Sequence, residues 1–366
     1  MTSGSSAQAY GEDPLVEQPT IELFAALGWE TANLHHEWAS GASSEGRRSP
    51  KEVFLAPRLR AALRRLNPDL PETAFDQAVE ELTRDRSLQV PVNANAELYR
   101  LLKDGLKVRL PDEAGGSTTA TVRFIDWRNP AANDFLLASQ VWIRGEVYRR
   151  RADLVGFVNG IPLLFLELKA PGVALKNAYD DNLTDYRHAI PHVFVPNGFV
   201  VLSNGSDTRI GSTYAAWEHF AEWKRINDEG EAGVVSLETV IRGTCTQARL
   251  LDLVENFVVF EETRTGLVKK LARNHQYLGV NNAIGALAEI KERPEGAAGK
   301  LGVFWHTQGS GKSLSMVFLT QKILRTVPGN WTFVMVTDRD ELDDQIFKTF
   351  ANTGAITGAE AQATSG

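Results

Sequence analysis

An acid and a base alternate at the end of a strongly apolar segment, LLFLELK at residues 163–169. In a β-strand alternate residues share a face, so Glu167 and Lys169 point one way while Leu166 and Leu168 point into the core. Charges carried out of an apolar segment are costly to bury and are commonly functional. The same E-x-K spacing also occurs on solvated strand faces. The spacing alone therefore does not predict a catalytic site, and a further functional residue nearby is needed.

A second acid, Asp153, begins the preceding apolar segment, DLVGFV. Asn159-Gly160 between the two segments is a strong hairpin signal, and antiparallel pairing would return Asp153 to the side of Glu167. Two carboxylates suit a hard cation such as Mg²⁺. Such an ion polarises a phosphodiester and lowers the pKa of an attacking water, while Lys169 orients the water or stabilises the developing charge.

The register of this hairpin decides whether the two acids can share an ion. A simple two-residue turn at residues 159–160 would place Asp153 opposite Leu166, on the wrong face. A three-residue loop, or one bulge, would place it opposite Glu167 instead. We therefore expect the simple turn to be absent or to be compensated by a bulge.

A glycine-rich segment, HTQGSGKS, follows the apolar stretch LGVFW and precedes the helix-compatible LSMVFLTQKIL. Its glycines let backbone N–H groups converge on phosphates at a helix N-terminus. Lys312 would reach the β- and γ-phosphates, and the Ser313 hydroxyl would ligand Mg²⁺. His306 stands where the strict phosphate-loop pattern has glycine. The predicted ATP-binding residues here are Gly309, Ser310, Gly311, Lys312 and Ser313.

The elements that must position these residues can be placed by periodicity. Helical patterns cover residues 51–66, 72–83, 175–188, 247–260 and 266–292. Alternating apolar patterns predict strands from about residue 106, through the hairpin, and at 192–196 and 198–204. The stretch from residue 301 to the end alternates strand, helix, strand and helix, which predicts parallel βα units.

Composition limits the class of protein. A chain of 366 residues predicts two domains, or one large domain and part of another. The formal net charge of −7 argues against a histone-like basic coat and leaves room for a local basic groove. A single cysteine, no signal sequence at the N-terminus and no apolar run of about 18 residues predict a cytoplasmic protein without a membrane span.

The segment RRADLVGFVNGIPLLFLELKAP resembles the PD-(D/E)xK nucleases, and more narrowly the restriction subunit of Type I restriction-modification enzymes. The sequence motif of that family is close to R-x-D-L-V-x-F-V-N-G-I-P-L-x-x-x-E-L-K-x-P. The resemblance implies that Asp153, Glu167 and Lys169 are catalytic. It also implies that Glu17, from the first helix, joins Asp153 and Glu167 as a metal ligand. Ala152 stands where the nominal motif has proline.

A Gln-x-x-x-Tyr motif usually follows in this family, on a helix near bound DNA. Here its register falls on Asn182 and Tyr186, within DNLTDYRHAIP. The resemblance implies that both are close to DNA, although the asparagine amide reaches less far than the family's glutamine. Tyr186 could instead simply pack its ring on the sheet.

The C-terminal third carries two further resemblances, both to superfamily 2 helicases. The segment LARNHQYLGVNNAI places Gln276 where the family's glutamine reads the adenine edge, although an exposed helical glutamine would look the same. The segment FVMVTDRDELDDQI resembles a motif on the side of the DNA track, with Arg339 among its polar members. These residues could also cap and solvate a helix.

A motor of this class also needs an acidic pair to hold Mg²⁺ and a second lobe to supply an arginine. No Asp-Glu-x-His or similar motif follows an apolar strand after the phosphate loop. We expect these parts to lie beyond residue 366, in a longer polypeptide.

The predicted fold class is α/β: a PD-(D/E)xK domain with a mixed sheet flanked by helices, then the start of a RecA-like parallel α/β lobe. The expected divisions are a disordered N-terminus at 1–13, the endonuclease domain at 14–235, a helical connection at 236–265 and the truncated motor lobe at 266–366.

The resemblance implies an endonuclease and ATP-dependent translocase that cuts unmodified foreign DNA with Mg²⁺ and ATP. The implied partners are double-stranded DNA and the methyltransferase (modification) and specificity subunits. Three alternatives stay open at this point. They are a stand-alone Mg²⁺-dependent nuclease with a vestigial phosphate loop, a nucleotide-dependent motor or switch with a dead nuclease site, and a structural module that tethers partners to DNA.

Overall fold

The computed structural model describes residues 13–111, 116–291 and 299–355. Most of the predicted disordered segment, residues 1–13, therefore lies outside the described residues.

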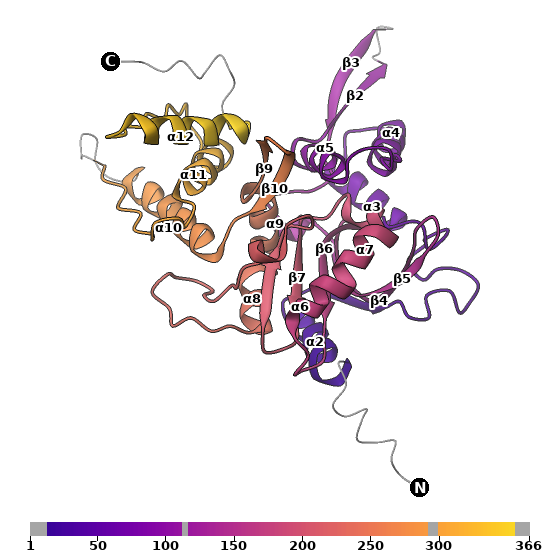
Figure 1. Ribbon diagram of the computed structural model, residues 1–366. Helices are drawn as coiled ribbons and strands as arrows, with labels where there is room; N and C mark the ends of the chain where they lie inside the picture. Colours follow the sequence, from indigo (N-terminus) through magenta and orange to yellow (C-terminus); the bar gives the residue numbers. More distant parts are fainter. Residues whose placement is uncertain (1–12, 112–115, 292–298, 356–366) are drawn as a thin grey trace.

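A six-stranded sheet in the order β1-β4-β5-β6-β7-β8 forms the centre of the fold (Figure 1). Its strands are β1 (Glu30–Asn33), β4 (Phe135–Arg144), β5 (Arg149–Val158), β6 (Ile161–Leu168), β7 (Phe199–Ser203) and β8 (Thr208–Gly211). The β1–β4 and β6–β7 pairs are parallel and the other pairs are antiparallel, so the sheet is mixed, as predicted.

Helices cover both faces of this sheet, because its strands are apolar on both sides. Leu164 and Leu166 belong to one buried cluster, and Phe165 between them belongs to another. The first cluster receives side chains from α2 (Gln18–Ala26), α3 (Ala56–Leu66), α4 (Glu72–Thr83), α5 (Pro91–Asp104), α8 (Leu237–Thr244) and α9 (Gln247–Asn256). The second receives them from α6 (Leu175–Asn177), the π-helix η3 (Ala178–Leu183), α7 (Thr184–Ala189) and the 3₁₀ turn η4 (Pro191–Phe194). The predicted strand at 192–196 is therefore wrong, since Pro191 opens a 3₁₀ turn there.

Several shorter elements lie outside the six-stranded sheet. A two-stranded hairpin of β2 (Leu106–Pro111) and β3 (Ser117–Val122) projects from the domain (Figure 1). The π-helix η1 (Asp13–Glu17) precedes α2, and the 3₁₀ turns η2 (Pro130–Ala132) and η5 (Trp217–His219) lie in connections.

The β5–β6 hairpin has the register on which a shared metal site depends. Asn159 and Gly160 both have left-handed backbone, with φ of +51° and +75°, and they form a two-residue turn that pairs Val158 with Ile161. The register then shifts between Gly156 and Phe157, because β6 contains one extra residue. Beyond the shift Leu154 lies opposite Leu166, and the next residues in line are Asp153 and Glu167. The prediction of a turn compensated by a bulge is confirmed.

Gly160 combines a left-handed backbone with close packing. A Cβ there would lie 2.5 Å from the Leu55 carbonyl oxygen and 2.9 Å from the Leu59 nitrogen, both fixed backbone atoms. We expect Gly160→Ala to lower the free energy of unfolding by about 2–4 kcal/mol, from backbone strain and overpacking together. Urea unfolding measures the loss. Gly41→Ala is the matched control, because Gly41 has a similar φ of +84° with nothing within 4 Å of the added carbon. An equal loss in both variants would contradict the packing argument.

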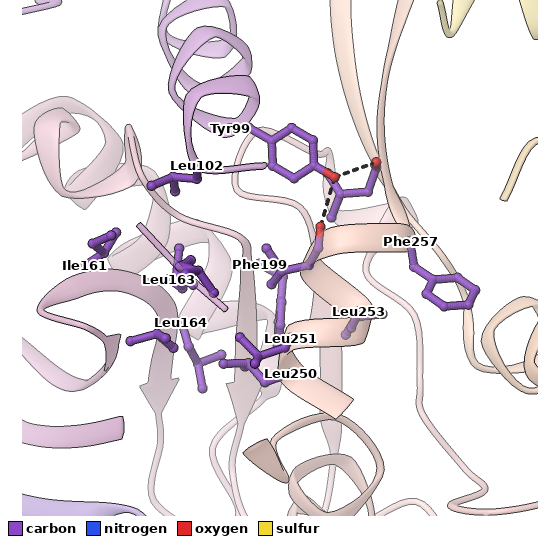
Figure 2. Close-up of a cluster of buried hydrophobic side chains, with 14 of the residues drawn as sticks. Tyr99, Leu102, Ile161, Leu163, Leu164, Phe199, Leu250, Leu251, Leu253 and Phe257 are labelled. Atoms are coloured by element: carbon purple, nitrogen blue, oxygen red, sulfur yellow. Dashed lines mark hydrogen bonds between the residues drawn. The ribbon is translucent and has the colours of Figure 1, made fainter. Parts of the chain in front are cut away.

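Residues 237–271 pack into the same core as the sheet. Leu250, Leu251 and Leu253 of α9 are buried, and Leu163, Phe199 and Tyr99 belong to the same cluster (Figure 2). The Tyr99 hydroxyl donates to the Val254 carbonyl oxygen at 2.9 Å, which fixes α5 to the end of α9.

An antiparallel hairpin of β9 (Val258–Thr263) and β10 (Gly266–Leu271) follows α9. Helix was predicted for residues 257–260 and 266–271, and this was wrong. Two β-branched residues, Val258 and Val259, favour the strand. The apolar positions of 266–271 fit either period.

The C-terminal part consists of α10 (Asn274–Lys291), α11 (Lys312–Thr326) and α12 (Asp340–Asn352). Tyr277, Phe318 and Phe350 from these helices join the first buried cluster, so the core is continuous from the sheet to α12.

The strands predicted at 301–305 and 331–337 are absent from the described residues, and this is a correction. Their apolar side chains are exposed: Val303 by 87%, Val334 by 83% and Val336 by 89%. A strand requires a neighbour to take its hydrogen bonds. The described residues offer no ladder partner to either segment.

Candidate active site and phosphate loop

The hairpin brings Asp153, Glu167 and Lys169 together. Asp153 is 9% exposed and Glu167 only 1%. The Leu168 N–H donates to the Asp153 Oδ2 at 2.9 Å, and Lys169 Nζ donates to the Glu167 Oε1 at 3.1 Å. Two buried carboxylates on β5 and β6 and one ammonium group directly after β6 therefore occupy neighbouring positions.

Burial raises the pKa of the Asp153 carboxyl, while the Leu168 N–H and the Lys169 charge act in the opposite direction. Because the pKa is raised in the folded state, ionising Asp153 costs stability, and the stability of the metal-free protein falls as pH rises through that pKa. A bound cation would reverse this cost.

We expect Asp153→Asn to stabilise the metal-free chain at pH 8 by about 0.5–2 kcal/mol, the usual range for a single stabilising substitution. The amide oxygen can still accept from Leu168, and no charge is buried. The gain should shrink at pH 5, where more of the wild-type carboxyl is protonated. Urea unfolding in a chelator at both pH values tests this, with exposed Asp69→Asn as control. A destabilised variant at pH 8 would contradict the electrostatic argument.

The two residues predicted to lie near DNA are adjacent to this group. Burial, and next the charge of Glu167, raise the pKa of Tyr186, and the Asn182 side chain acts in the opposite direction. The Tyr186 ring packs edge-on against Phe165 with centroids 5.7 Å apart, and its hydroxyl donates to the Arg151 carbonyl oxygen at 3.1 Å. Tyr186 therefore both packs on the sheet and lies within electrostatic reach of the acids.

Glu17 does not complete a three-carboxylate group with Asp153 and Glu167. Across the part of the chain that the structure describes, no three His, Cys, Asp or Glu side chains gather closely enough to hold a metal ion. Glu17 is 2% exposed, and its Oε2 accepts a hydrogen bond of 2.6 Å from Nε2 of Gln140 on β4. Sequence reasoning missed Gln140, although a glutamine within the apolar segment FLLASQVWI was a signal that could have found it.

The Asp153–Glu167 pair still fits Mg²⁺. This ion is commonly bound through one or two carboxylates and keeps several of its waters, whereas a dedicated cage of protein ligands is unusual for it. A buried pair of oxygen donors without histidine or cysteine is such a donor set.

The predicted phosphate loop contains two glycines in left-handed conformation, Gly309 with φ +77° and Gly311 with φ +84°. Helix α11 begins directly afterwards, at Lys312 and Ser313. Lys312 folds back on the loop, where its Nζ donates to the carbonyl oxygens of His306 at 2.9 Å and Thr307 at 3.1 Å. The lysine must leave these oxygens to reach a phosphate.

Gln276 lies against this loop. It is 3% exposed, its Nε2 donates to the Gly311 carbonyl oxygen at 3.0 Å, and its Oε1 accepts from the Arg273 N–H at 2.9 Å. It is therefore no exposed helical glutamine. Its neighbour His275 has Nε2 3.0 Å from the Ser310 carbonyl oxygen.

Arg339 is the last of the predicted site residues. It precedes α12 and its side chain is 78% exposed, 3.9 Å from a carboxylate oxygen of Asp338. The structure leaves it on the surface, away from the hydrogen bonds that hold the phosphate loop.

The structure thus combines a mixed sheet that carries a buried acid pair with a glycine-rich loop at the start of α11. Two family models match separate parts of the chain. Residues 9–219 match the family model of the Type I restriction enzyme R protein N terminus, and residues 275–366 match that of the SWI2/SNF2 ATPase. The chain belongs to the family of Type I restriction enzyme R proteins.

Individual relatives agree with this assignment. The HindI endonuclease subunit of Haemophilus influenzae is 35% identical over 347 residues, which cover 92% of this chain and 32% of that protein. The MjaIXP endonuclease subunit of Methanocaldococcus jannaschii is 27% identical over 375 residues, or 94% of this chain and 34% of that protein. The chain spans about a third of the length of these relatives. None of the described helices is long and apolar enough to cross a membrane.

Proposed function

We propose that this chain cleaves DNA phosphodiester bonds with a divalent cation, as the endonuclease part of a Type I restriction enzyme, and that its C-terminal part opens an ATP-driven DNA motor. The observation that carries the proposal is the β5–β6 register. One bulge in this hairpin brings the buried carboxylates Asp153 and Glu167 into neighbouring positions. Lys169 is hydrogen-bonded to Glu167. Family membership supports it.

Each residue of the acid site would have a separate role in cleavage. Asp153 and Glu167 would hold Mg²⁺, which when bound supplies Lewis-acid polarisation and a water of lowered pKa. Lys169 Nζ would orient the attacking water, or stabilise the negative charge that develops on the phosphate. Tyr186 and Asn182 would border the DNA side of this face. The resemblance assigns Glu17 as a metal ligand. Here Glu17 would act on the metal site indirectly, through its hydrogen bond with Gln140.

The nucleotide site is proposed on the second group of residues. The N–H groups of the loop from Gly309 to Ser313 would surround the phosphates of ATP. Lys312 would exchange two carbonyl oxygens for phosphate oxygens, and the Ser313 hydroxyl would ligand Mg²⁺. Gln276, already fixed beside Gly311, would face the adenine edge. Arg339 would lie toward the DNA track.

The partners follow from the family. We propose that the chain acts in the cytoplasm on unmodified double-stranded DNA, within a complex that contains methyltransferase (modification) and specificity subunits. Target recognition would belong to the specificity subunit, so the described site needs no base-reading elements of its own. The proposed division into a nuclease domain at 14–235, a connection at 236–265 and a motor from 266 stays a prediction.

The test uses the complete enzyme and unmodified DNA that carries its target. We expect cutting to require both Mg²⁺ and ATP, and to stop on addition of a chelator or on omission of ATP. Cutting with Mg²⁺ alone would favour the stand-alone nuclease with a vestigial phosphate loop. ATP hydrolysis without cutting in any preparation would favour a motor with a dead nuclease site.

A further inference from the structure

Gln140 occupies an unusual position in the middle of β4. Its neighbours Ser139 and Val141 pair with Leu154 and Ala152 of β5, so the residue across from Gln140 is Asp153. The pairing is interrupted at this one position. The interruption therefore falls directly beside the proposed metal site.

The cause of the interruption is the Gln140 backbone, which has φ of +56°. This left-handed region is readily adopted by glycine, and occasionally by asparagine or aspartate, but it is strained for a glutamine. Among the described residues one other non-glycine has positive φ, Asn159, where the hairpin turn demands it. No turn demands it at Gln140, which lies between two buried strand residues. Strain that the surroundings maintain in this way is characteristic of functional positions.

The strained backbone has a visible consequence for the side chain. The Gln140 amide donates to the Glu17 Oε2 at 2.6 Å, across 123 residues of sequence. Glu17 is 2% exposed, and a hydrogen bond to a buried carboxylate is both strong and directional. Gln140 thus lies across from Asp153 in the strand register and binds the Glu17 carboxylate through its side chain.

We propose that Gln140 is a positioning residue of the metal site, which fixes the Glu17 carboxylate relative to Asp153. The proposal rests on the proposed nuclease function. The Glu17 carboxylate is hydrogen-bonded to this amide, and among the described residues it forms no three-carboxylate group with Asp153 and Glu167. Groups that orient metal ligands in this way commonly change metal affinity or activity 10- to 100-fold when they are removed, by order of magnitude.

Two variants separate the amide from the backbone strain. Gln140→Met keeps the strain and the side-chain length but removes the amide. Gln140→Gly removes the amide and the strain together. We expect both to bind Mn²⁺ about tenfold or more weakly than the unaltered chain. The glycine variant should have the higher Tm of the two. Gln77→Met, at an exposed position on α4, is the matched control and should change neither property.

Binding of Mn²⁺ alone to this chain is measured by calorimetry below the lowest Tm of the set, with Glu167→Ala as reference. The proposal is supported if both Gln140 variants are folded and bind weakly, and if the complete enzyme that carries them binds DNA normally but cuts it more slowly. Wild-type Mn²⁺ affinity in either variant overturns it, as does a loss of affinity that follows a loss of folded protein. Wild-type affinity in Glu167→Ala would instead reject the proposed metal site itself.

Discussion

Glu167→Ala or Lys169→Ala abolishes DNA cleavage by the complete enzyme while ATP hydrolysis continues: this is the expected result with the largest effect. Glu167 supplies a metal-binding carboxylate and Lys169 the adjacent positive charge. Removing one stabiliser of developing charge commonly lowers a catalytic rate by about 10²–10³-fold. ATP hydrolysis should survive, because the phosphate loop is built on different elements, between residue 305 and α11. Linearisation of unmodified plasmid and phosphate release are measured in the same samples.

A matched control exists elsewhere in the chain. Glu261 on β9 and Lys270 on β10 form an acid–lysine pair on another hairpin, outside the proposed site. Glu261→Ala and Lys270→Ala should cut DNA at the wild-type rate. If Glu167→Ala also cuts at that rate, the nuclease assignment is wrong.

The sequence could predict the placement of the two acids, because that placement depends on the pairing of two adjacent strands. A hairpin turn, strand alternation and the need for two acids on one face together require a bulge between Asp153 and Glu167, and the bulge is present. The residue types alone did not reveal where the extra residue would be accommodated. It is Leu163, which the core accepts because both Leu163 and Leu164 pack in the first buried cluster.

The parts that sequence could not predict depend on distant contacts. Gln140 has a left-handed backbone inside a strand, and its side chain is hydrogen-bonded to Glu17, which is far away in the chain. The β9–β10 hairpin was mistaken for helix because its apolar spacing fits both periods. The apolar runs at 301–305 and 331–337 have strand composition, but composition does not supply a pairing neighbour.

The C-terminal part is attached to the rest of the fold through α11. Lys322, 7% exposed, forms an ion pair with Asp252 of α9 and donates to the Asn281 Oδ1 of α10 at 2.6 Å. A buried ion pair of this kind fixes relative position more than it adds stability. The helix that begins at the phosphate loop is therefore held firmly, whereas the apolar segments on either side of it are exposed.

This 366-residue chain, by itself, should not turn over ATP at a meaningful rate, although it contains Lys312. The phosphate loop supplies ground-state contacts, whereas phosphoryl transfer also needs acidic metal ligands, a positioned water and an arginine. The sequence after the loop has no Asp-Glu-x-His motif, and Lys312 is bound to carbonyl oxygens. Nucleotide binding should be weak, because apolar faces beside the loop are uncovered and leave it less rigid. Phosphate release is measured with and without duplex DNA, and with Lys312→Ala as control. DNA-stimulated release that disappears in the control would show that the loop needs no further motor parts.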